Sequence, residues 1–236
     1  MAISLASCFL IALFVWDEWQ YDRFHPAADR TYRVYNMAGA KDGVQGYFPI
    51  VPYPFASYMQ KDFPEIESTL RIMDMYGDQL FETGGKKVMQ GGGLYAEPTV
   101  FDMLTLTVVS GNAHDALIKP NTIALSSSLA KKYFGDKNPI GETIRANNEG
   151  YEVTAVFSDP PGNFHLTINY LLSFASTGWQ NRFENLGIGI LFNKRLKLGL
   201  QLIGVRTRLQ FQVGKYLLAL PVILKTVLPA RGCKRK

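Results

Sequence analysis

Residues 1–16, MAISLASCFLIALFVW, form an apolar run without a single charged side chain. Two acids end this run, Asp17 and Glu18, and the aromatic residues Trp19 and Tyr21 come immediately after them. The small residues within the run suit helix packing in lipid, and the clustered aromatics suit the interface of a bilayer. We therefore predict a transmembrane helix over residues 1–16. A span needs about 20 apolar residues, so we expect this helix to be clipped at its N-terminus.

Three other interpretations of the run stay open. A signal peptide needs an early basic residue and a small-residue cleavage site, but the first basic residue is Arg23 and the run ends in bulky Val15 and Trp16. The stretch from Leu5 to Cys8 looks like a lipoprotein lipobox, although the apolar run continues past it. A buried helix of a soluble domain leaves the aromatic cluster unexplained. The scarcity of Lys and Arg beside the run favours the translocated side of the membrane for the next part of the chain.

Charge is distributed unevenly, so the net charge of +5 describes neither half of the chain. Residues 1–184 hold 14 basic and 20 acidic side chains, whereas residues 185–236 hold 11 basic and no acidic ones. A nucleic-acid-binding domain presents a basic folded face, and here the part that looks folded is acidic, so we expect no nucleic-acid partner. The only cysteines, Cys8 and Cys233, have neither zinc-site nor redox spacing, which argues against a disulfide-built scaffold.

The middle of the chain mixes short strand and helix patterns in irregular order. Strands are predicted over 30–36, 66–75, 104–109, 122–125, 151–157 and 166–174, a hairpin over 79–82 and 87–90, and short helices over 57–61, 98–103 and 129–134. The last helix has an N-cap serine at 126 or 127 and Gly135 at its C-terminal end. Irregular alternation of this kind predicts an α+β domain with a mixed sheet rather than a doubly wound one.

Motifs for bond chemistry are missing from the sequence. The histidines (His25, His114, His165) lack metal-ligand spacing, Gly84–Lys87 lacks the spacing of a phosphate loop, Ser126–Ser128 has no nucleophile elbow, and four aspartates (Asp22, Asp29, Asp102, Asp136) are unpaired in sequence. Helix capping, turns and surface positions account for these residues. We therefore predict no catalytic residue, no cofactor-binding residue and no metal site.

Three stretches, taken in order after the apolar run, make the chain recognisable. They are DRFHPAADRTYRVYN (22–36), FDMLTLTVVSGNAHDALIKPNTIALSSSLAKKYFGDKNPIGETI (101–144) and YEVTAVFSDPPGNFHLTINYLLSF (151–174). Together they resemble the periplasmic core domain of MacB/FtsX-type ABC transporter permeases, particularly the long duplicated ones of Bacteroidetes. The resemblance covers about residues 3–183, and AKKYFGDKNPIG, at 130–141, carries the most weight.

The resemblance implies that residues 17–183 are a periplasmic core domain held outside the bacterial inner membrane. In that family the domain couples transmembrane motion to export or release of substrate by shape change and is not an enzyme. An ATP-binding subunit on a separate chain drives it. The resemblance therefore implies the lipid bilayer, that subunit, a second permease copy and periplasmic proteins as partners, and no cofactor. The alternative is a membrane-anchored periplasmic binding or adaptor protein without transport activity.

Residues 184–236 are a basic tail of uncertain structure, because the resemblance stops near Leu186 and the acids stop at Glu184. The abrupt charge break suggests a frameshift or a truncated gene copy. A basic amphipathic tail is the alternative, in which Tyr216–Leu228, interrupted by Pro221, lies on a surface as a helix.

Overall fold

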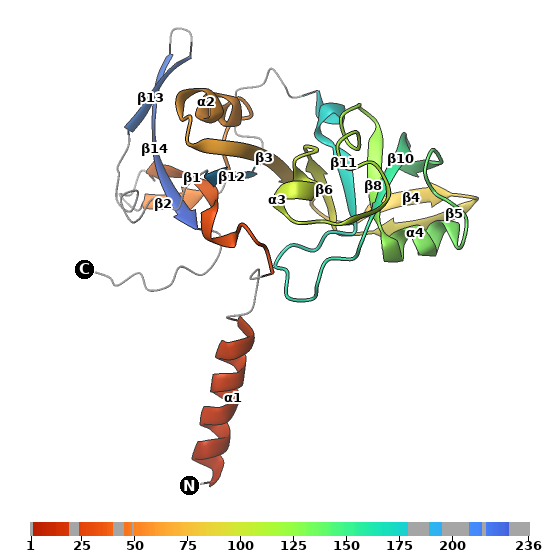
Figure 1. The fold of residues 1–236 in the computed structure, drawn as a ribbon, viewed down its shortest axis with the longest axis horizontal. Coiled ribbons are helices and arrows are strands. Elements are labelled where there is room, and N and C mark those ends of the chain that lie inside the picture. Colours follow the sequence, from red (N-terminus) through yellow and green to blue (C-terminus); the bar gives the residue numbers. More distant parts are fainter. Residues whose placement is uncertain are drawn as a thin grey trace.

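A helix and a sheet-based body make up the chain (Figure 1). The structure, a computed structural model, describes residues 2–18, 24–39, 45–48, 50–178, 189–194, 208–213 and 216–226. The helices are α1 (Ala2–Glu18), α2 (Phe55–Asp62), α3 (Val100–Met103) and α4 (Ser127–Phe134), with 3₁₀ turns η1 (Ala28–Arg30) and η2 (Phe174–Thr177). Helix α1 projects from the body, and the other three lie against the sheet.

The strands form one mixed sheet. They are β1 (Thr31–Gly39), β2 (Gln45–Phe48), β3 (Ile66–Asp74), β4 (Gln79–Thr83), β5 (Lys86–Gln90), β6 (Gly93–Ala96), β7 (Val108–Gly111), β8 (Thr122–Ser126), β9 (Thr143–Ala146), β10 (Glu149–Phe157), β11 (Tyr170–Ser173), β12 (Gly189–Lys194), β13 (Arg208–Val213) and β14 (Tyr216–Thr226). Their order is β13-β14-β1-β12-β3-β6-β11-β8-β10-β9-β4-β5, with β2 beside β1 and β7 beside β10. Among the described strands, β8–β10 and β6–β11 pair in parallel and the other pairs are antiparallel. The predicted α+β class with a mixed sheet is confirmed.

Helix α1 forms where the transmembrane helix was predicted, but the membrane-spanning prediction is not supported. None of the helices in the described part of the chain combines the length and the apolar character that crossing a bilayer requires.

Three other predictions need correction. The apolar stretch 104–109 is not one strand: Leu104 and Leu106 are buried beyond the end of α3, and β7 begins only at Val108. The strand predicted over 166–174 is confined to β11. The surface helix considered for 216–228 is wrong, since 216–226 is β14, paired with β13 and β1. A proline inside a helix would break its hydrogen bonds, and Pro221 falls in the middle of this stretch.

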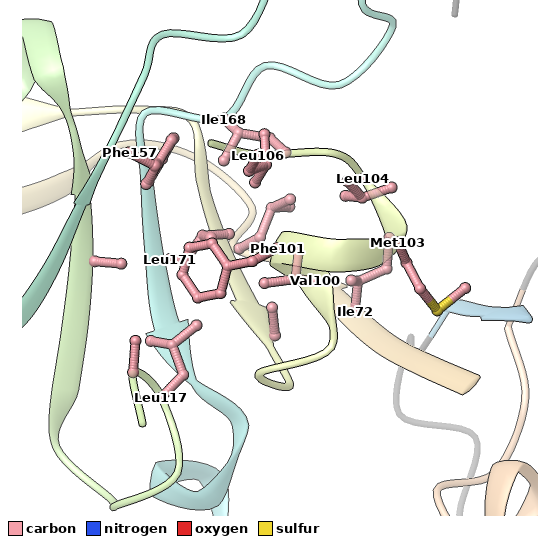
Figure 2. Packing of buried hydrophobic residues seen from close by; sticks show 14 of the residues in the cluster. Ile72, Val100, Phe101, Met103, Leu104, Leu106, Leu117, Phe157, Ile168 and Leu171 are labelled. Carbon is pink, nitrogen blue, oxygen red and sulfur yellow. The ribbon is translucent and has the colours of Figure 1, made fainter. Parts of the chain in front are cut away.

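Three buried clusters fill the body, and each is named here after its helix. The α2 cluster joins α2 to Val34, Met73 and Phe174. The α3 cluster packs Phe101 of α3 toward Leu171 and Phe157, as Figure 2 shows. The α4 cluster has these buried members: Phe81, Ile123, Leu125, Leu129, Ala130, Ile144, Ala146, Tyr151, Val153, Val156, Tyr170 and Leu172. The described core is therefore spread along the sheet in three blocks.

Strand β3 connects two of these blocks. Leu70 and Ile72 lie in the α3 cluster, whereas Met73 lies in the α2 cluster, because successive strand side chains point to opposite faces. Its edges are also shared, since residues 66–72 pair with β12 and residues 72–74 pair with β6. The nine residues of β3 therefore contribute to two clusters and pair with two neighbouring strands.

An ion pair lies beside Ile72, where the pairings of β3 with β12 and with β6 overlap. The Arg71 guanidinium donates to Glu97 Oε1 from Nε at 2.9 Å and from Nη2 at 2.5 Å, and the Arg71 amide donates to Glu97 Oε2 at 3.0 Å. Arg71 also donates to the Tyr53 carbonyl at 3.2 Å and lies 4.0 Å from the centroid of its ring. Both charged side chains are mostly buried, at 12% and 19% exposed. We call Tyr53, Arg71 and Glu97 the β3 clasp.

The three glycines at 91–93 allow close packing in the α4 cluster. A Cβ at Gly93 would overlap the ring of Tyr170, and Gly92 has φ +75° with the Asn169 amide directly beside it. A positive φ is strained for residues with a side chain. The run of glycines therefore lets β6 start beside the buried Tyr170.

Breaking the β3 clasp should destabilise the fold more than breaking an exposed pair. Glu97→Gln leaves the Arg71 charge buried without its carboxylate, which typically costs about 3 kcal/mol. Glu67→Gln removes the Arg30–Glu67 pair, which is 39% and 45% exposed, and exposed pairs contribute less than about 1 kcal/mol. Denaturant unfolding of both variants checks this, and equal losses would contradict the role given to the clasp.

The buried tyrosines should make the fold sensitive to alkali. Burial is the main cause that raises the pKa of Tyr151 and of Tyr170. Because the folded-state pKa exceeds the unfolded value of about 10, their contribution to the free energy of unfolding is complete below that pH and is lost as pH rises through the folded-state values. Replacing both with Phe should flatten the decline above pH ~10, measured by chemical denaturation. The exposed Tyr76→Phe is the control, and an unchanged slope in the double variant would refute this account.

Candidate functional site at the junction with the N-terminal helix

The chain enters the body through two aromatic rings. Phe24 is half-buried against the α3 cluster, and His25 is buried at 8% exposed. Phe24 meets the ring of Phe164 edge-on at a centroid distance of 5.5 Å, and the His25 ring lies 5.4 Å from the same ring. His25 Nδ1 is 3.2 Å from Thr105 Oγ1. We call Phe24, His25, Thr105 and Phe164 the aromatic joint.

Thr105 holds an unusual backbone conformation in this joint. Its φ is +53°, which costs a β-branched residue roughly 1–2 kcal/mol. This positive φ at Thr105 turns the backbone so that the Leu106 amide donates to the Phe101 carbonyl at 2.9 Å, immediately after α3 ends. Leu104 and Leu106 are both buried as a result. Strain of this kind persists only where the surroundings determine the conformation. The contact for His25 is therefore held on a fixed backbone.

A groove of about 460 Å³ runs beside the joint. It is lined by the segment after Phe24, the start of β3 and the region of α3: Pro26, Ala27, Arg30, Glu67, Ser68, Thr99, Asp102, Met103 and Thr105. Across it, Arg30 Nη1 donates to Glu67 Oε2 at 2.7 Å. One guanidinium faces two carboxylates in this groove, so its charge favours a cationic or polar occupant over an anionic one.

The residues singled out by sequence take structural positions. Ser126 caps α4 by accepting from the Leu129 amide at 3.3 Å, and Gly135 ends the helix with φ +64°, as predicted. His114 and His165 are exposed, whereas His25 enters the joint. Asp102 lines the groove, and Asp136 is exposed after α4. The side chains of Asp22 and Asp29 lie outside the described residues.

Within the ranges that the structure describes, no group of three or more His, Cys, Asp and Glu side chains comes close enough to hold a metal ion. The prediction of no catalytic or cofactor residue stays a prediction. The joint and groove were missed because their partners are distant in sequence: His25 and Thr105 are separated by 80 residues. The one available signal was Phe24-His25-Pro26 shortly after the apolar run.

Comparison with protein families gives a match over most of the chain. The model of the MacB-like periplasmic core domain family matches residues 1–198. This match extends past residue 183, where we expected the resemblance to end, and includes β12, which pairs with β1 and β3. No curated protein matches the chain.

Three solved structures share the fold. A domain of an inferred permease protein from Porphyromonas gingivalis is 24% identical with a TM-score of 0.66, covering 77% of this chain and 79% of that one. The periplasmic region of MacB from Actinobacillus actinomycetemcomitans is 18% identical with a TM-score of 0.55, covering 73% and 78%. The extracellular domain of the noncanonic ABC-type transporter YknZ from Gram-positive bacteria is 13% identical with a TM-score of 0.50, covering 71% and 84%.

Removing the shared ring should loosen the joint selectively. Phe164→Ala deletes the surface that Phe24 and His25 both contact and should cost about 3 kcal/mol of global stability. Amide exchange should also rise at Ala28 and Arg30, whose amides bond the carbonyls of His25 and Ala27.

Phe81→Ala, in the α4 cluster, is the matched control because it removes a buried ring from a different cluster. It should lower global stability without selective exchange in 28–30. Equal exchange in the two variants would show that the joint is not a separate unit.

Proposed function

Because the chain belongs to the MacB-like periplasmic core domain family of ABC transporter permeases, we propose that it is a membrane-anchored permease component that works mechanically. In this proposal the body passes motion between the membrane and extracytoplasmic substrates, and so serves export or release without bond chemistry. The anchoring segment is α1, and the aromatic joint carries its displacement into the body.

The aromatic joint is the observation that carries this proposal. A helix can move a domain only if the chain that leaves the helix is fixed to the domain. Phe24 and His25 meet this need, because both rings pack on Phe164 within the α3 cluster and His25 also contacts Thr105. The α3 cluster in turn contains Leu70 and Ile72 of β3. A displacement at Phe24 would therefore reach the strand that connects the cores.

The surface of α1 supports contact with lipid. Its large apolar side chains from Leu5 to Trp16 are 46–71% exposed, and a free protein rarely leaves a contiguous apolar surface of this kind uncovered. Inserting these side chains into the hydrocarbon of the bacterial inner membrane would cover them. Trp16 lies at the end of the apolar run, at the depth expected for an interfacial aromatic.

The energy for such motion would come from an ATP-binding subunit on a separate chain, which the proposal includes as a partner. A second permease copy and periplasmic proteins are further partners in this scheme. A membrane-anchored binding or adaptor protein is the second candidate, and the observation that favours it is the groove of about 460 Å³ beside the joint. The two candidates differ in whether an ATP-binding subunit is bound.

Copurification discriminates between them. The full chain, expressed in its own host and extracted from membranes in mild detergent, should copurify with an ATP-binding subunit identified by mass spectrometry. A chain that leaves the membrane fraction in the absence of detergent would contradict the anchoring role of α1. A membrane-bound chain that purifies as a monomer without an ATP-binding subunit, and gains thermal stability from a small ligand, would favour the adaptor instead.

A further inference from the structure

Four lysines gather where α4 meets β5. Lys131 and Lys132 are exposed on α4, Lys137 is exposed just after it, and Lys86 is exposed at the start of β5. We call them the α4 lysine patch. They stand out because residues 1–184 carry more acidic than basic side chains.

Contacts between α4 and the hairpin place Lys132 and Lys86 on the same side of the hairpin, with Lys131 and Lys137 nearby in the chain. Lys132 Nζ donates to Gln90 Oε1 at 2.9 Å. Alternate residues of a strand share a face, so Lys86 points to the same side of β5 as Gln90. The ring of Phe81 in β4 lies 5.9 Å from that of Tyr133 in α4, which confirms that α4 covers this face. Lys137 comes directly after the helix, its amide bonded to the Phe134 carbonyl.

The patch carries more basic than acidic side chains. In the part of the chain that the structure describes, none of the four lysines forms an ion pair, whereas the neighbouring Lys87 pairs with Glu82 at 2.6 Å on the opposite face of the hairpin. The nearest acid in sequence is Asp136, which is exposed between Phe134 and Lys137. Two further acids border the patch, since Asp159 accepts from Ser128 in the first turn of α4 and Asp78 lies beside Gly91, next to Gln90. Four bases against these three acids leave a net positive surface.

Helix α4, which carries part of the patch, lies on the side of the body from which α1 projects (Figure 1). In Figure 1, α4 lies below β4 and β5, on the side from which α1 projects, while α2 lies on the upper side. A bilayer that holds α1 would therefore run beneath α4. Positively charged side chains near a membrane surface are attracted by anionic head groups, by about fivefold in occupancy for each lysine.

We propose that the α4 lysine patch docks on anionic phospholipid head groups of the bilayer in which α1 is anchored. The inference rests on the proposed function, because it requires α1 to lie in that bilayer. The membrane then contacts the body twice, through α1 and through α4. This second contact restricts rotation of the body about the aromatic joint. The strength of the contact depends on the anionic lipid content of the membrane.

Lysine acylation tests the contact directly. The full chain is reconstituted into vesicles of phosphatidylcholine alone and into vesicles that also contain phosphatidylglycerol, then treated with a membrane-impermeant acylating reagent and analysed by mass spectrometry. Lys131 and Lys132 should be acylated about fivefold less in the anionic vesicles. Lys61 is exposed on α2, the helix on the upper side in Figure 1, and should react equally in both. Salt at about 1 M should remove the difference in acylation, because the Debye screening length falls to about 3 Å.

Variants test whether the lysines act as one patch. K131E/K137E, which keeps the Lys132–Gln90 bond, should remove the protection of Lys86 and Lys132, while K61E should leave it intact. Equal acylation in neutral and anionic vesicles would overturn the proposal. Protection that persists in detergent would also overturn it, since a bound acidic protein would then cover the patch.

Vesicle flotation in the same samples separates the two proposals. A chain that floats with both kinds of vesicle but shows no lysine protection retains its anchor and refutes only the docking of α4. A chain that floats with neither refutes the anchor, and with it the proposed function.

Discussion

The β3 clasp is the interaction on which the rest of the body depends. Strand β3 is covered on both faces by different clusters and pairs with β12 on one edge and β6 on the other, the two pairings overlapping at Ile72. At that point Arg71 is bonded to Glu97, just after β6, and packed on Tyr53, just before α2. Burial raises the pKa of the Tyr53 hydroxyl, and the Arg71 charge opposes this. One guanidinium therefore joins three segments that share no turn.

The aromatic joint contacts the same packed core that the clasp holds together. The joint meets the body at Phe164 and Thr105, and Phe164 lies in the same cluster as Leu70 and Ile72 of β3. A push on Phe24 therefore acts on a packed core, which transmits strain because interiors are close-packed. Mechanical work needs this continuity more than it needs reactive groups.

The sequence predicted those features that depend on neighbouring residues. The period of YEVTAVF predicted β10, the glycines predicted the turn between β4 and β5, and Ser126 with Gly135 predicted the limits of α4. The sequence could not predict contacts between residues far apart in the chain, such as Arg71 with Glu97 or His25 with Thr105. The apolar stretch after α3 was misjudged because burial of Leu104 and Leu106 is achieved by the reversed backbone of Thr105 rather than by a strand. The apolar run predicted a helix over residues 1–16, and α1 continues to Glu18, past the last apolar residue of that run.

The most direct test of the mechanical account is a distance measurement between α1 and the body in vesicles. One spin label occupies the exposed Cys8 and a second occupies Tyr76→Cys, with Cys233 replaced by Ser. Pulsed electron resonance should give a narrow distance distribution that broadens when Phe24 and Phe164 are both replaced by Ala. A distribution that is already broad with the joint intact, or that is unchanged when the joint is removed, would show that α1 does not drive the body through these rings.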